Sequence, residues 1–145
     1  MQVRLVDDGL NLIEFDVHML GIPIGNGEGQ EVVAKWRLLD PDFSNKKVFY
    51  TDSNGLEMQK RTLDYRETWN LSTEMKVSSN YYPINSAIAV QSANSNLRQL
   101  TVMNDRAQGG SALAEGTIEL MQNRRLFFDD NRGVEQVLNE TDSNG

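Results

Sequence analysis

Alternation of apolar and polar residues constrains the fold of this chain more than any other feature. Four apolar residues, separated by single polar ones, occur at Ile13, Phe15, Val17 and Met19. Successive side chains of a strand point to opposite faces, so this period of two predicts a strand with one buried face. The pair Asp8-Gly9 just before it is a turn signal. It predicts a hairpin that begins near Val3.

The same pattern returns along the chain and predicts an all-β fold. Further strands are expected at 32–38, 47–51, 56–61, 86–92 and 99–104, with a hairpin turn at Asp52-Ser53-Asn54-Gly55. The segment 117–125 fits either a strand or a helix. Apolar spacing typical of a helix does not persist over three turns anywhere. About seven short strands with frequent turn signals predict an antiparallel β-sandwich.

Composition bounds the partners and the extent of the domain. The net charge of −7 argues against nucleic acid or an anionic membrane as partner. No segment approaches the roughly 20 apolar residues of a membrane span. Hydrophobic residues make up 39%, a low share that leaves apolar surface to meet other polypeptide. We expect residues 1–145 to form a single sandwich domain or a fragment of a larger one, because both ends resemble interior sequence.

Catalytic chemistry has little support in these residues. His18 is the only histidine, it lies on the polar face of an alternating segment, and cysteine is absent. Metal-ligand spacing and a Gly-x-Ser-x-Gly nucleophile motif are also absent. Asp129 and Asp130 are adjacent, so in a strand they would point to opposite faces rather than form a glycosidase pair. We therefore predict no catalytic residue and no metal ligand in this chain.

Two segments concentrate polar side chains. Residues 104–111 bring Asp105 and Arg106 to a turn before paired glycines, and residues 123–133 hold three arginines, two carboxylates and two aromatic rings. Such arginines can pair with carboxylates or donate to sugar hydroxyls. A loop network satisfied within itself and a ligand-contacting surface both remain open.

Two N-glycosylation sequons point to a secretory route. They are Asn70-Leu71-Ser72 and Asn139-Glu140-Thr141. Average residue usage gives about one sequon in a chain of this length, so two give mild support. We predict glycans at Asn70 and Asn139.

Short motifs in a fixed order carry a family resemblance over about residues 12–141. They are Gly21-Ile22-Pro23-Ile24-Gly25, Gly29-Gln30-Glu31-Val32-Val33, Phe49-Tyr50-Thr51-Asp52-Ser53-Asn54-Gly55, Asp64-Tyr65-Arg66, Asn80-Tyr81-Tyr82-Pro83-Ile84-Asn85, Asp105-Arg106-Ala107-Gln108-Gly109-Gly110-Ser111, Glu119-Leu120-Met121, Arg124-Arg125-Leu126 and Asp129-Asp130-Asn131-Arg132-Gly133-Val134. In these motifs the chain resembles the α-mannosidases of glycoside hydrolase family 38, closest to the lysosomal branch. The first residues, Met1 to Asn11, match less well.

The resemblance implies a part of a larger enzyme. Members of the family remove terminal α-linked mannose from N-glycans with retention, using a carboxylate nucleophile and a zinc ion that binds sugar hydroxyls. Those motifs belong to an N-terminal catalytic α/β domain and are absent here. The chain is therefore expected to be inactive alone, to contain no cofactor itself, and to have that zinc-binding domain and mannose-containing glycans as partners. A lysosomal or secretory location, including vacuolar or extracellular, is expected.

The resemblance also implies a rim of the substrate cleft. An arginine of the family's Arg-Arg pair contributes there, which corresponds to Arg125, with Arg124 beside it. We expect substrate contacts from Arg125 first, and then from Arg124, Asp130 and Arg106. Two alternatives remain. The chain could be a stand-alone carbohydrate-binding or adhesion module, or a scaffold that only covers the catalytic domain.

Overall fold

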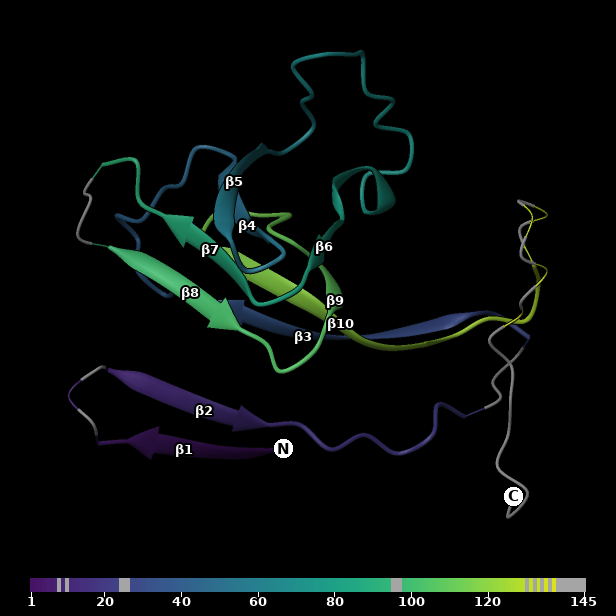
Figure 1. Ribbon diagram of the computed structural model, residues 1–145, viewed down its shortest axis with the longest axis horizontal. Coiled ribbons are helices and arrows are strands. Elements are labelled where there is room, and N and C mark those ends of the chain that lie inside the picture. Colours follow the sequence, from purple (N-terminus) through teal and green to yellow (C-terminus); the bar gives the residue numbers. More distant parts are fainter. Residues whose placement is uncertain are drawn as a thin grey trace. The chain divides into compact units, whose positions relative to one another are not determined.

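The computed structural model of the chain is all-β, as the alternation predicts. It describes residues 1–7, 9, 11–23, 27–94, 98–129, 131, 133, 135 and 137. The elements are β1 (Gln2–Val6), β2 (Leu12–Asp16), β3 (Gln30–Arg37), β4 (Val48–Ser53), β5 (Glu57–Thr62), the 3₁₀ turn η1 (Ser78–Asn80), β6 (Tyr82–Ile84), β7 (Ala87–Gln91), β8 (Gln99–Met103), β9 (Gln108–Ser111) and β10 (Thr117–Arg125) (Figure 1). The segment 117–125, for which the sequence fits either a strand or a helix, is a strand.

The chain divides into two compact units. Residues 31–124 form the larger unit, and residues 1–30 with 125–145 form the smaller one. The larger unit holds two four-stranded sheets, with the orders β3-β10-β9-β6 and β5-β4-β7-β8. All neighbours in the second sheet are antiparallel, and β9 is antiparallel to both β10 and β6. Together the two sheets make the predicted sandwich.

The core lies between these two sheets. Phe49, Ile88 and Val90 come from one sheet, and Ile84, Ile118 and Leu120 come from the other, all at most 2% exposed. Trp36 of β3 packs against this cluster. Burial of apolar surface from both sheets is what holds the sandwich closed.

Two carboxylates tie loops of the larger unit together. Asp52 accepts hydrogen bonds from the backbone N–H groups of Gly55, Asn85, Ser86 and Ala87 at 2.8–3.2 Å. Burial alone would raise the pKa of Asp52, but these four donors outweigh it and hold the pKa far below its ordinary value. The carboxylate thus joins the β4–β5 turn to the β6–β7 turn.

The carboxylate of Glu115 likewise binds backbone N–H groups of a distant turn, at residues 44–47. It accepts from the N–H groups of Asn45, Lys46 and Lys47 and from the Ser44 hydroxyl at 2.7–3.2 Å. Lys46 and Lys47 have left-handed backbones, with φ of 47° and 65°. This conformation is unfavourable for lysine, and the bonds to Glu115 offset its cost. Burial opposes these bonds, yet they lower the pKa of Glu115.

The smaller unit contains the predicted N-terminal hairpin. β1 and β2 pair antiparallel from Gln2↔Asp16 to Val6↔Leu12. Strand β2 is shorter than the alternation predicts, because it ends at Asp16. The prediction that β2 has a buried apolar face is wrong, because Ile13 and Phe15 are both exposed. A two-stranded ribbon has no second layer of its own to cover such a face.

Candidate functional site

One end of the sheet β3-β10-β9 gathers arginines from segments far apart in sequence. The β9–β10 register pairs Glu119 with Ser111 and Leu120 with Gly110. This antiparallel register directs the segment before β9, which holds Arg106, toward the C-terminal end of β10, which holds Arg124. The Gln108 side chain donates to the Met121 carbonyl at 3.0 Å and fixes this end of the pair. The fold thus brings two of the predicted residues, Arg106 and Arg124, to the same sheet end.

Arg124 makes a weak contact in the described part of the chain. Its Nη2 lies 3.6 Å from Glu31 Oε1, and both side chains are about two-fifths exposed. No other side-chain partner of its guanidinium is found among the described residues. An arginine has five N–H donors, so most of them face water here. The side chain can therefore donate to a ligand hydroxyl without losing a strong protein contact.

Arg125, the last residue of β10, is held in place. Its Nη1 donates to the Ile22 carbonyl at 2.8 Å, and its guanidinium carbon lies 5.9 Å from the centre of the Phe127 ring. Gly29 permits the close packing of this segment, since a Cβ there would lie 2.9 Å from Leu126 Cδ2 and 3.3 Å from the Arg125 carbonyl oxygen. These contacts fix the direction of the Arg125 side chain.

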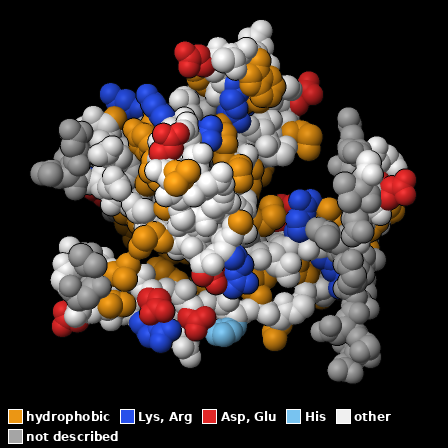
Figure 2. All heavy atoms as spheres, in the orientation of Figure 1, with side chains coloured by type: hydrophobic (Ala, Val, Ile, Leu, Met, Phe, Trp, Pro, Cys, Tyr) orange, Lys and Arg blue, Asp and Glu red, His pale blue; other side chains and the backbone are white. Residues whose placement is uncertain are grey.

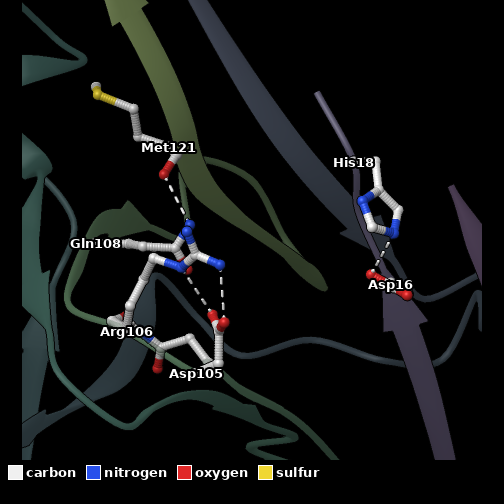
Figure 3. A network of polar contacts seen from close by, with 7 residues as sticks. Asp16, His18, Asp105, Arg106, Gln108 and Met121 are labelled. Atoms are coloured by element: carbon white, nitrogen blue, oxygen red, sulfur yellow. Dashed lines mark hydrogen bonds and ion pairs between the residues drawn. The ribbon is translucent and has the colours of Figure 1, made fainter. Parts of the chain in front are cut away.

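Arg106 forms a forked pair with its neighbour. Its Nε and Nη2 donate to the two carboxylate oxygens of Asp105 at 3.1 and 2.8 Å (Figure 3). The hydrogen bond lowers the pKa of Asp105, and the carboxylate raises the pKa of Arg106. Both side chains are three-quarters exposed, so the pair contributes little stability. It presents a planar polar group to solvent at the sheet end.

A second polar network on the same sheet escaped the sequence reasoning. Glu119 is 5% exposed, and it accepts from the Tyr81 hydroxyl at 2.6 Å and pairs with Lys35 at 3.1 Å. Burial, and then the hydrogen bond to Glu119, raise the pKa of Tyr81 well above its ordinary value. Alternation places Glu119 on the polar face of β10, but it carries no signal that a tyrosine from a distant loop covers the carboxylate.

The remaining predicted residues lie on other segments of the chain or outside the described residues. Asp130 and Asn139 lie outside the described residues. Asn70 is exposed. His18 is an exposed surface residue, and its Nε2 lies 3.2 Å from Asp16 Oδ1 (Figure 3). Within the described ranges no group of three potential metal-ligating side chains comes together. The same ranges contain no helix long and apolar enough to cross a membrane.

Comparison with known proteins defines the class of this chain. It matches the family model of the glycosyl hydrolases family 38 C-terminal domain over residues 2–132. The chain therefore belongs to this family, as its motifs predict.

Individual relatives narrow the likeness further. The chain is 48% identical over 139 residues to a lysosomal alpha-mannosidase of Felis catus, covering 96% of this chain and 13% of the relative. It is 43% identical over 142 residues to that of Homo sapiens, covering 98% and 14%. It is 38% identical over 120 residues to that of Dictyostelium discoideum, covering 83% and 12%. The chain thus spans about an eighth of the length of these relatives.

Proposed function

We propose that this chain is a supporting and substrate-rim part of a retaining α-mannosidase that removes terminal α-mannose from N-glycans. Family membership supports the enzyme class. The observation that carries the rim role is the basic sheet end, where Arg106 and Arg124 are partly or largely exposed and Arg125 ends the same strand β10. The planar guanidinium group of arginine carries several N–H donors and suits sugar hydroxyls. Asp130 belongs to the proposed rim as an acceptor of such hydroxyls.

The catalytic groups are proposed to lie elsewhere in the parent protein. The one histidine of this chain, His18, is exposed and pairs with Asp16. Among the described residues no third potential metal ligand joins this pair. Such a donor set does not fit zinc. We assign the zinc ion expected for the family, like the nucleophile, to the N-terminal catalytic α/β domain, and we assign no step of the reaction to this chain. Alone, the chain is expected to be inactive.

The same proposal covers the extent of the domain, its partners and its location. We place residues 1–145 within the C-terminal sandwich region, packed against the catalytic domain. The exposed apolar face of β2 is one surface available to other parts of the parent. The named relatives are lysosomal, and the chain carries two sequons and a charge of −7. A lysosomal or secretory location and glycans at Asn70 and Asn139 follow as proposals.

The rim role is tested by the variant Arg125→Ala in the full parent enzyme. A hydrogen bond from a charged donor contributes about 1.5–3 kcal/mol, so kcat/KM for an α-mannoside should fall by roughly 10- to 100-fold. The melting temperature should hold. Arg98→Ala, which removes an exposed ion pair with Asp40 at another part of the sandwich, serves as the matched control and should leave kcat/KM unchanged.

Three outcomes separate the alternatives. Loss of activity at an unchanged melting temperature supports the rim role. Full activity of Arg125→Ala overturns it and leaves a pure scaffold. A large drop in melting temperature with an unchanged kcat/KM would also overturn it, because the bond to the Ile22 carbonyl would then be the whole purpose of Arg125.

A further inference from the structure

The loop between β5 and β6, residues 63–81, is firmly anchored. Its hub is Asn80, whose side chain is fully buried. The Asn80 Nδ2 donates to Asp64 Oδ1 and to the Lys76 carbonyl, both at 2.9 Å, and its Oδ1 accepts from the Asp64 N–H at 2.8 Å. Ser111 Oγ donates to the Asn80 carbonyl at 2.8 Å and fastens the loop to β9. This loop therefore has a defined shape.

Four large apolar side chains of this anchored loop are exposed, beside charged ones such as Glu67 and Glu74. Trp69 is 58% exposed and Met75 is 70% exposed, and Tyr65 and Val77 are also exposed. Figure 2 shows hydrophobic side chains on the surface of the loop, at the top of the view. An exposed indole in a well-bonded loop is unusual, because a tryptophan side chain gains much of its stabilising energy from burial. Something outside the described chain is expected to cover it.

A glycosylation sequon lies within the same surface. Asn70 directly follows Trp69, and both Asn70 and Ser72 are exposed. Ser79 Oγ donates to the Ser72 carbonyl at 2.8 Å, which holds the sequon against the anchored base of the loop. A glycan attached at Asn70 would begin one residue along the chain from Trp69. The same glycan, being bulky and hydrated, would keep another protein surface away from this side.

We infer that the N-linked glycan of Asn70 packs its first sugar residues against the indole of Trp69 and shields the exposed apolar side chains of the loop. This inference rests on the proposed glycosylation of Asn70. The C–H face of a pyranose ring is apolar, and it stacks on a flat aromatic ring while its hydroxyls stay in water. The loop is then a built platform for the chain's own oligosaccharide.

The test compares two substitutions of one residue in the full parent enzyme, made in a eukaryotic secretory host. Ser72→Ala destroys the sequon, and Ser72→Thr preserves it; neither changes Asn70, Trp69 or the backbone carbonyl that Ser79 contacts. Mass spectrometry gives the occupancy of Asn70. Hydroxyl-radical footprinting, read by peptide mass spectrometry, gives the oxidation rate of Trp69. Trp36, packed against the core, is the internal reference.

We expect an occupied Asn70 in the wild type and in Ser72→Thr. Oxidation of Trp69 should rise about twofold in Ser72→Ala alone, since the glycan covers one of the two faces of the indole ring. If Asn70 is occupied in the wild type and in Ser72→Thr but Trp69 is oxidised equally in all three proteins, the shielding is overturned and the glycosylation of Asn70 stands. An unoccupied Asn70 would overturn both. Strong protection of Trp69 in every protein would show that another part of the parent covers the loop.

Discussion

At the scale of single residues, carboxylates that accept backbone N–H groups organise the larger unit. Asp52 and Glu115 each satisfy several donors that would otherwise be unpaired in tight turns. Neither role could be predicted from sequence. Three of the four N–H groups that Asp52 accepts from lie 33 to 35 positions away, and the partners of Glu115 lie 68 to 71 positions away. Nothing local distinguishes these residues from any other acidic residue beside a turn.

The variant Asp52→Asn tests this role. It replaces a charged acceptor by a neutral amide and should lower the free energy of unfolding by about 1–3 kcal/mol at pH 7. The folded pKa of Asp52 lies below its unfolded value, so the wild-type advantage is full above about pH 4 and is lost as the pH falls through the folded pKa. Urea titrations from pH 7 to pH 3 check both points. A wild-type advantage that shrinks between pH 7 and pH 5 would contradict the account.

At the scale of elements, the strands that lie where the sequence predicts them include two pairs joined by polar turn segments. The hairpin β4–β5 and the pair β7–β8 lie at the predicted places, and Asn54 and Gly55 have the expected left-handed turn, with φ of 52° and 72°. Two strands were missed. β6 includes a proline and is three residues long, and β9 contains two glycines, so neither has a readable apolar pattern.

The glycines of β9 are explained by packing. A Cβ on Gly110 would lie 2.7 Å from Leu120 Cδ2, 2.8 Å from Ile84 Cγ1 and 3.1 Å from the Glu119 carbonyl oxygen. Both side chains are buried in the core and have little room to move. Glycine is therefore needed where the two strands and the core meet.

Gly110→Ala should accordingly destabilise the sandwich by about 1–3 kcal/mol, because a methyl group is forced into a filled core. Gly21→Ala is the matched control, since a Cβ there meets nothing within 4 Å. It should change the stability by less than about 0.5 kcal/mol. Thermal unfolding measures both. Equal stability of the two variants would show that the core beside β9 is looser than the structure describes.

The candidate site was predictable only in part. The Arg-Arg pair and the Asp-Arg turn could be singled out as polar segments, and the register of β9 and β10 then brings Arg106 and Arg124 to one sheet end. The contact that holds Arg125 could not be predicted, since the Ile22 carbonyl lies 103 positions away in the sequence. Arg125 and the Ile22 carbonyl meet only after the chain has folded.

At the scale of the whole molecule, the chain is an all-β member of a glycosidase family, and among its described residues no group of three potential metal ligands comes together. It spans about an eighth of the length of its relatives, and an arginine-rich sheet end and a loop with exposed apolar side chains are its two most distinctive surfaces. Both are proposed to act within a larger enzyme, the first toward substrate and the second beneath a glycan.

These residues are proposed to support catalysis in the parent enzyme without performing it. Hydrolysis of a chromogenic α-mannoside tests this directly, with the purified chain and the full parent assayed side by side, with and without zinc. Circular dichroism on the same samples reports whether the chain holds its β-structure. We predict turnover by the parent and no turnover above the uncatalysed rate by the folded chain. Turnover by the chain alone would contradict the account and direct attention to Asp105, Asp129 and Asp130.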